Sequence, residues 1–173
     1  MKVEKVGALS FPSLEKQLSF SGLDSWTNFV QSVYDYKIHR YAVLENSNPV
    51  AAISLTEVKH PIFGHYLITA PFGSYGGFAY ENSEARNLLL DEVRQLAEQT
   101  KVEYVSIHHG EGASIPPDNW IPHPAYCTYL IDLPSTPDEL LKTFASDHRN
   151  HVRKSIKKGF QVRIGHLDLL DDI

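Results

Sequence analysis

Hydrophobic residues recur at two spacings along this chain, one typical of helices and one typical of strands. After Asp24 or Ser25, either of which can cap a helix, apolar side chains return every three or four positions. These side chains are Trp26, Phe29, Val30 and Val33. A second helix is predicted after Asn82 or Ser83, and its apolar stripe is wide. The stripe comprises Ala85, Leu88, Leu89, Val93, Leu96 and Ala97.

Runs of alternating or branched apolar residues predict strands between and after these helices. The predicted strands span residues 40–44, 49–59, 66–69, 101–107, 126–131 and 160–164, and the first twenty residues are interpreted as an extended lead-in strand. The polar turn Glu45-Asn46-Ser47-Asn48 is predicted to join the first two of these strands into a hairpin. Four prolines within residues 115–124 predict a loop there.

The longest predicted helix covers residues 136–158 and has clear start and stop signals. Thr136, Pro137 and Glu139 predict a capping box with proline in the first turn, and Gly159 predicts the end of the helix. Six residues at helical spacing are predicted to face the core. They are Leu140, Leu141, Phe144, His148, Val152 and Ile156.

Together these elements predict an α/β (α+β) fold with a mixed, mostly antiparallel sheet flanked by helices. Hydrophobic residues make up 42% of the 173 positions and charged residues 21%, which is globular usage and argues against a disordered chain. The length fits a single domain over residues 1–173. Residues 167–173 resemble the first turn of a further helix, so we expect this chain to be part of a longer protein.

Composition limits which binding partners and which cellular compartment we expect for this protein. The formal net charge is −5, so any phosphate or nucleic-acid site must be a local basic patch. Cys127 is the single cysteine and lies in the apolar run 126–131, which indicates a buried thiol and excludes an internal disulfide. No apolar run approaches the ~20 residues that span a bilayer, and the N-terminus lacks a signal-peptide pattern. We therefore expect a cytoplasmic protein without an integral membrane segment.

One face of the predicted 136–158 helix is basic. Arg149, Arg153 and Lys157 recur every fourth residue, while Lys154 and Lys158 form a neighbouring row. Two interpretations remain open. The cations can be a solvated face that complements the helix dipole, or they can contact a phosphate or nucleic acid, for which arginine offers paired donors.

A glycine-dense loop follows the third predicted strand. Its central residues Ser74, Tyr75, Gly76 and Gly77 would let backbone amides approach an anion. The loop lacks the Lys-Ser/Thr ending and the Gly-x-Gly-x-x-Gly spacing of known phosphate-binding loops. The alternative is a turn with positive φ angles that positions Phe72 and Tyr75 in a core or groove.

Nine histidines raise the question of a metal site, and we expect none. His108 and His109 are neighbours at the end of a predicted strand, where adjacent side chains point to opposite faces. His148 and His151 lie one turn apart on the basic helix, but no third ligand stands out. The chain has no Gly-x-Ser-x-Gly elbow, and spacing alone assigns no Ser/His/Asp arrangement.

Three segments, taken in order, carry a family resemblance. They are Trp26-Thr27-Asn28-Phe29-Val30, the 71–77 loop Pro-Phe-Gly-Ser-Tyr-Gly-Gly, and the helix end at residues 148–159, His-Arg-Asn-His-Val-Arg-Lys-Ser-Ile-Lys-Lys-Gly. This layout resembles the first half of FemAB-like proteins, a group of peptidoglycan-bridge aminoacyltransferases and related acyltransferases built from two acetyltransferase-like (GNAT-type) domains. The resemblance implies a GNAT-like fold for residues 1–173 and a second, C-terminal GNAT-like domain as its partner.

The resemblance also implies a reaction. An amine attacks an activated acyl group carried by tRNA or by a thioester, and catalysis consists of orienting the substrates and stabilising the oxyanion. Arg149, Arg153, Lys154 and Lys157 would contact a phosphate-bearing donor or acceptor, and Tyr75 with the neighbouring glycine amides would line the groove. No tightly bound cofactor is implied, and aminoacyl-tRNA or acyl-CoA would be a co-substrate. Much of the active site would lie in the second domain, so this chain need not be active alone.

Two other functions remain open. A non-catalytic module would use the basic helix to dock a nucleic acid or an acidic protein. A complete stand-alone acetyltransferase would need a phosphate-cradling loop that runs into a helix N-terminus for the coenzyme, and the sequence shows no convincing one.

Overall fold

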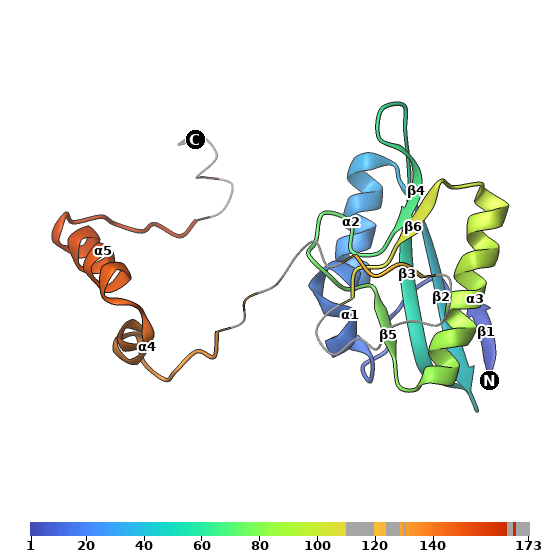
Figure 1. Ribbon diagram of the computed structural model, residues 1–173, viewed down its shortest axis with the longest axis horizontal. Helices are drawn as coiled ribbons and strands as arrows, with labels where there is room; N and C mark the ends of the chain where they lie inside the picture. Colours follow the sequence, from blue (N-terminus) through green and yellow to red (C-terminus); the bar gives the residue numbers. More distant parts are fainter. Residues whose placement is uncertain (110–119, 124–128, 130, 166–167, 169–173) are drawn as a thin grey trace. The chain divides into compact units, whose positions relative to one another are not determined.

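The computed structural model describes residues 1–109, 120–123, 129, 131–165 and 168. The chain divides into two compact units, Met1–Tyr126 and Cys127–Ile173. The first unit holds a sheet with three helices, and the second holds two short helices (Figure 1). The single domain that the sequence predicts over residues 1–173 stays a prediction.

Six strands form one sheet in the first unit. They are β1 (Lys2–Lys5), β2 (Lys37–Glu45), β3 (Asn48–His60), β4 (Gly64–Ile68), β5 (Phe78–Tyr80) and β6 (Tyr104–Ser106). The order across the sheet is β1-β2-β3-β4-β6, and β5 pairs with β3. The described pairs are antiparallel, except that β4 and β6 are parallel. The mixed, mostly antiparallel sheet predicted from the sequence is confirmed.

The β2–β3 hairpin lies where the sequence predicts it. Glu45 pairs with Asn48, so the turn holds two residues, Asn46 and Ser47, with φ angles of 49° and 69°. Positive φ at both central positions is the geometry of a type I′ turn, which matches the twist of the flanking strands. The turn fixes the register of the two longest strands and therefore decides which side chains face each side of the sheet.

β4 and β5 pair with the same edge of β3, one after the other along its length. β4 pairs with residues 56–60 of β3, and β5 pairs with residues 51–53. Between them, residues 69–77 leave the sheet and include the glycine-dense loop. The sequence prediction missed β5, because a three-residue strand directly after two glycines is too short to show a period. Of the strand predicted at 101–107, only residues 104–106 pair, in β6.

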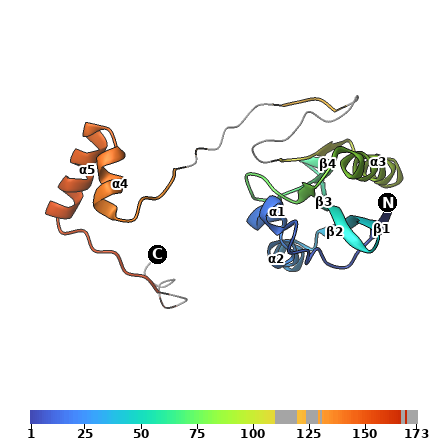
Figure 2. The same cartoon turned by 90° about the horizontal axis from the view of Figure 1, so that it is seen from below.

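Helices cover both faces of the sheet (Figures 1 and 2). α3 (Ser83–Thr100) lies on one face, and α1 (Glu15–Gly22) and α2 (Asp24–Tyr34) lie on the other. On the α3 side, Leu89 and Val93 are fully buried against Ile53 and other apolar residues of the sheet, so the stripe predicted for this helix is confirmed as its core face. Asn82 caps α3 as predicted, because its side chain accepts a 2.9 Å hydrogen bond from the amide of Ala85.

A buried charge anchors α2 on the opposite face. The guanidinium Nε of Arg40 on β2 lies 2.8 Å from Oδ1 of Asp24. Its Nη2 donates to the Thr27 hydroxyl and the Asn28 amide oxygen at 2.8 and 2.7 Å. Asp24 also accepts a hydrogen bond from the amide of Leu9. A buried cation is tolerated only when it is paired and hydrogen-bonded, so this network sets the rotation of α2 about its axis.

The extended lead-in predicted for the first twenty residues is corrected by this arrangement. These residues form β1 and then enter α1, and Leu14, just before the helix, packs into the core together with Leu18 within it. In α2 the buried residues are Thr27 and Val30, while Phe29 and Val33 are 51% and 54% exposed. The apolar row predicted along this helix is therefore divided. Val30 faces the interior together with Thr27, which reaches the buried guanidinium of Arg40, while Phe29 and Val33 face outward.

The second unit contains two helices where one was predicted. α4 (Pro137–Thr143) and α5 (Ser146–Lys157) are separated by Phe144 and Ala145, whose ψ angles of 151° and 155° are extended. The continuous helix predicted over residues 136–158 is therefore wrong. Ser146 and Asp147 account for the break, because both residue types favour the start of a helix over its interior.

The predicted start and stop signals of this region are confirmed. Thr136 and Glu139 form the reciprocal hydrogen bonds of a capping box. Gly159 follows α5 with a φ of 71°, the left-handed conformation that commonly ends a helix.

Two other predictions for the second unit are wrong. α4 and α5 contain no buried residue, so the six residues predicted to face a core do not enclose one within the described part of this unit. The strand predicted at 160–164 does not form, and Val162 and Ile164 are 90% and 94% exposed. A strand needs a partner for its backbone groups, and no strand is described in this unit. The strand predicted at 126–131, with Cys127, lies largely outside the described residues.

Candidate functional site

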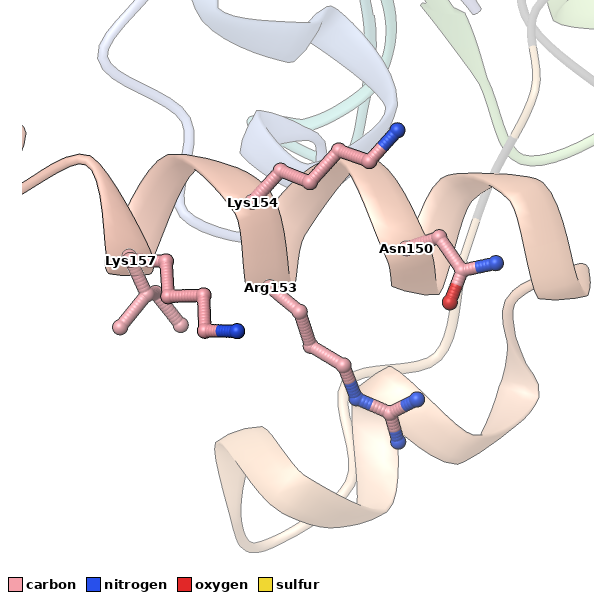
Figure 3. Close-up of a pocket in the computed structure, with 5 residues that line it drawn as sticks. Asn150, Arg153, Lys154 and Lys157 are labelled. Atoms are coloured by element: carbon pink, nitrogen blue, oxygen red, sulfur yellow. The ribbon is translucent and has the colours of Figure 1, made fainter.

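Helix α5 carries the predicted basic face. Arg149, Arg153 and Lys157 occupy successive turns of this helix, with Lys154 in the neighbouring row. Figure 3 shows the side chains of Arg153 and Lys154 diverging from the helix, Lys154 upward and Arg153 downward in this view. The break before Ser146 leaves this face intact, because all four cations lie within α5.

Arg149 is already engaged within its own unit. The residue is half-buried, and its Nη1 donates a hydrogen bond to the carbonyl oxygen of Phe144. Carbonyl groups at the end of a helix have no intrahelical donor, so a side-chain donor at this point stabilises the junction. Arg149 therefore ties the start of α5 to the end of α4, and only its remaining guanidinium N–H groups can contact a ligand.

The other three cations are available for a ligand. Arg153, Lys154 and Lys157 line a shallow hollow of about 460 Å³ together with Asn150 and Ile156 (Figure 3). Among the described residues, none of the three cations has an ion pair or a side-chain hydrogen bond. Like charges one turn apart repel one another by a few tenths of a kcal/mol, so a bound anion would relieve a repulsion as well as form new contacts.

The glycine-dense loop is a close-packed turn in this structure. The amide of Gly77 donates to the carbonyl of Leu18 at 2.8 Å, and the amide of Gly76 donates to the carbonyl of His108 at 3.0 Å. A Cβ atom on Gly22 would lie 2.1 Å from the amide nitrogen of Gly77, so glycine is needed where α1 meets the loop. Both amides that the sequence assigns to an anion therefore donate within the fold, and anion binding there stays a prediction.

Ser74 and Tyr75 differ from the two glycines. Ser74 is exposed and Tyr75 is half-buried, so both side chains can reach a ligand. The backbone of Tyr75 is fixed, because its carbonyl accepts a 2.6 Å hydrogen bond from the hydroxyl of Ser21 on α1. The rigid positions of these residues suit a binding surface, and their role in binding stays a prediction.

Sequence reasoning missed the polar groups at the carboxyl ends of β4 and β6. In this sheet the two strands are the parallel pair, and ligands commonly bind beyond the carboxyl ends of such strands. The amide of His108, just after β6, donates to the hydroxyl of Thr69, just after β4, at 2.8 Å. The Nδ1 atom of the His108 ring is buried and has no hydrogen-bond partner among the described residues. Only the parallel pairing, which the sequence does not show, brings these residues together.

A second polar cluster lies on the α3 side of the sheet. The carboxylate of Glu57 bridges two histidines, with Oε2 2.8 Å from Nε2 of His39 and Oε1 2.9 Å from Nε2 of His65. Burial lowers the pKa of His39, and the hydrogen bond to Glu57 offsets this only in part. Burial alone would raise the pKa of Glu57, but the hydrogen bonds from both rings outweigh it, so the pKa of Glu57 is lowered. The cluster joins β2, β3 and β4.

Two further kinds of site were sought within the residues that the structure describes. No group of three or more His, Cys, Asp and Glu side chains among them has the geometry to hold a metal ion. No described helix combines the length and the apolar character that crossing a bilayer requires.

Comparisons with known proteins give only distant similarity. No family model matches the sequence, and no curated protein matches it. Among solved structures, a probable acetyltransferase is similar to this chain at a TM-score of 0.48 and 11% identity, over 79% of this chain and 100% of the other. The Thermus thermophilus protein TTHA1254 is similar at TM-scores of 0.47 for a mutant and 0.45 for the wild type, at 14% identity with the same coverage.

Proposed function

We propose that this chain is the N-terminal part of a FemAB-like N-acyltransferase with a GNAT-like fold, which transfers an acyl or aminoacyl group to an amine. The observation that carries the proposal is the set of three unpaired cations, Arg153, Lys154 and Lys157, that line the hollow on α5. These residues belong to one of the three segments that carry the resemblance to FemAB-like proteins. The mixed, mostly antiparallel sheet flanked by helices supports the fold part of the proposal.

The chemistry of the proposed reaction explains why such cations are needed. The amine nitrogen attacks the acyl carbon, a tetrahedral intermediate forms, and the bond to the thiolate or ribose oxygen of the donor breaks as the amine loses a proton. Aminoacyl-tRNA and acyl-CoA both carry several phosphates, and cell-wall precursors carry a diphosphate. Arg153 can hold a phosphate through two parallel N–H donors, and the two lysines add charge without fixed geometry. Binding at the phosphates would orient the reacting acyl group.

A binding measurement tests this role of α5. We expect Arg153→Ala combined with Lys157→Ala to weaken binding of a tRNA mixture or of coenzyme A at least about tenfold, because each charge-assisted contact contributes about 1.5–3 kcal/mol. The matched control is Lys16→Ala with Lys59→Ala, which removes the same charge from exposed positions in the other unit. Fluorescence anisotropy with labelled tRNA and calorimetry with coenzyme A measure the dissociation constants. An equal loss of affinity in both double variants would contradict a specific binding site on α5.

A second function, a non-catalytic binding module, is favoured by one observation. The residues 127–173 form a compact unit of their own, and α5 within it carries basic residues in its last turn and a single acidic residue in its first. Such a unit could dock a nucleic acid by charge alone. Strong retention on heparin with a steep salt dependence, together with no acyl transfer by the protein at its full native length, would favour this function over the first.

A further inference from the structure

Exposed aromatic side chains lie along α2 in the first unit. This surface, called the aromatic face below, extends from α1 along α2 to the glycine-dense loop. It comprises Phe20, Trp26, Phe29, Val33, Tyr34 and Phe72. Ring centroids lie 4.8 Å apart for Phe20 and Trp26 and 5.5 Å apart for Trp26 and Phe29. Tyr34 stacks on Phe72 at 4.8 Å. Neighbouring rings therefore contact one another, and the sides of the rings that face away from the fold stay exposed to solvent.

The exposed area is large for a free surface. Phe20, Phe29, Tyr34 and Phe72 are 63%, 51%, 49% and 65% exposed. With about 200 Å² for each aromatic side chain, these four residues alone expose roughly 450 Å² of mostly apolar surface. The largest apolar patch on a typical monomer is about 300–600 Å², and one side of a stable protein interface buries about 800 Å². Together with Trp26, Val33 and a polar rim, the aromatic face approaches the size that a stable dimer needs.

The charge pattern of α2 indicates which partner fits. Residues 25–34 form an uninterrupted run without Asp, Glu, Lys or Arg, although 21% of the whole chain is charged. Their outward polar residues, such as Gln31 and Ser32, are neutral. In a two-fold symmetric interface, residues near the axis meet their own copies, so any charge there would face a like charge. An uncharged aromatic face meets itself without repulsion, whereas a nucleic acid would require cations.

Phe72 supplies a second argument for a protein contact. Its φ of 58° lies in the left-handed region, which costs a residue with a side chain about 1–2 kcal/mol. The ring gains only the stacking on Tyr34 in return and stays mostly exposed. The loop is held against α2 by a 2.8 Å hydrogen bond from the Trp26 indole to the carbonyl of Pro71. The strained conformation thus presents an aromatic ring outward at a fixed position.

We propose that the aromatic face is the interface of a symmetric homodimer, in which α2 of one chain packs against α2 of a second copy. The interface would bury the outward-facing side chains of Phe29 and Val33 on α2. The dimer does not depend on the function proposed above.

Sedimentation velocity of the whole chain from about 1 to 100 µM tests the proposal. We expect the wild type to sediment with the mass of two chains at the upper end of this range. Phe29→Lys should shift it to the monomer, because a cation would then meet its own copy near the axis. The matched control is Phe63→Lys at the β3–β4 turn, where the phenylalanine is 69% exposed and is not part of the aromatic face, and it should remain dimeric.

A mixing experiment separates a specific contact from general loss of hydrophobicity. Phe29→Lys and Phe29→Glu should each be monomeric alone, and an equimolar mixture should recover dimer because opposite charges then meet. If circular dichroism shows that Phe29→Lys is unfolded, Val33→Lys, one turn further along the same stripe, takes its place. A wild type that stays monomeric at 100 µM overturns the proposal. So does a dimer that survives both Phe29→Lys and Val33→Lys.

Discussion

At the scale of single residues, the carboxylate of Glu57 lies between two histidine rings and a lysine. It accepts hydrogen bonds from His39 and His65, which reach it from the neighbouring strands β2 and β4. Lys37, at 3.8 Å, adds a positive charge beside it. His39 is 2% exposed, so water solvates the charged form of its ring poorly and its pKa is lowered. Stability must therefore depend on pH through this cluster.

The sign of that dependence follows from the two pKa shifts. The pKa of His39 is lowered from its ordinary value of 6.5, so the unfolded chain takes up the proton first as the pH falls. Its contribution to stability is intact above about pH 6.5 and is lost as the pH falls toward the folded pKa. The pKa of Glu57 is lowered from 4.5, so its contribution is intact above that pH and is lost below it. Both groups therefore weaken the fold on the acid side.

We predict that His39→Gln reduces the pH dependence of stability. The variant should lose about 1–3 kcal/mol at pH 7, because a buried hydrogen-bonding ring is replaced. Its free energy of unfolding should then fall less steeply than that of the wild type between pH 7 and pH 5. Urea denaturation at a series of pH values measures both quantities. The control is His123→Gln at an exposed position, which should keep the wild-type slope, and an unchanged slope in His39→Gln would contradict the account.

How much of the site is readable from the sequence depends on whether the contacts are local. The row Arg149, Arg153 and Lys157 was found, because residues four apart share a helix face whatever the tertiary fold. The contact between Thr69 and His108 was not predicted, because it depends on the parallel pairing of β4 with β6. The hydrogen bond from Arg149 to Phe144 was also missed, since it exists only where the helix breaks.

At the scale of elements, close backbone packing joins α1 to the glycine-dense loop. Gly22 at the end of α1 meets Gly77 so closely that an added Cβ would lie 2.1 Å from the Gly77 nitrogen and 2.5 Å from its Cα. We predict that Gly22→Ala costs at least about 1–3 kcal/mol, since neither backbone can give way without moving an element. Chemical denaturation measures the loss.

Gly7 provides the matched control for that prediction. A Cβ added there meets nothing within 4 Å, so Gly7→Ala should change stability by less than about 0.5 kcal/mol. Equal stability of the two alanine variants would show that α1 and the loop are not packed as described.

The cap of α4 gives a second element-scale prediction. Thr136→Ala removes the acceptor for the amide of Glu139 and should cost about 0.5–2 kcal/mol of local stability. Hydrogen exchange of the whole chain should show faster exchange of the Glu139 amide, while Ser135→Ala, one residue earlier and outside the capping box, leaves it unchanged. Identical exchange in both variants would argue against the cap.

Element boundaries show where sequence patterns reach their limit. The apolar residues of α3 lie on one side of the helix and are buried against the sheet, so the core face predicted for this helix is confirmed. The apolar spacing in α2 predicts the helix but does not predict which of its residues are buried, because the buried Arg40 draws Thr27 inward. The strand predicted at 160–164 has a suitable pattern but no described partner in its unit, and strand pairing cannot be read from one segment alone.

At the scale of the whole molecule, charge is distributed unevenly. The chain has a net charge of −5, yet α5 carries four cations among its twelve residues and one acidic residue. Bulk electrostatics would repel a polyanion, so the proposed binding of a phosphate-bearing donor would depend on this local face. The proposed transferase function and the proposed dimer use different surfaces, α5 and α2, and can be tested separately.

The most direct test of the central claim is an acyl-transfer assay with the protein at its full native length. Labelled aminoacyl-tRNA and acetyl-CoA serve as donors, and amine-bearing cell-wall peptide precursors serve as acceptors. The account predicts label in a new amide bond, and a kcat/KM at least about tenfold lower for Arg153→Ala with Lys157→Ala, mainly through KM. No transfer from either donor, or equal rates for this variant and the wild type, would contradict it.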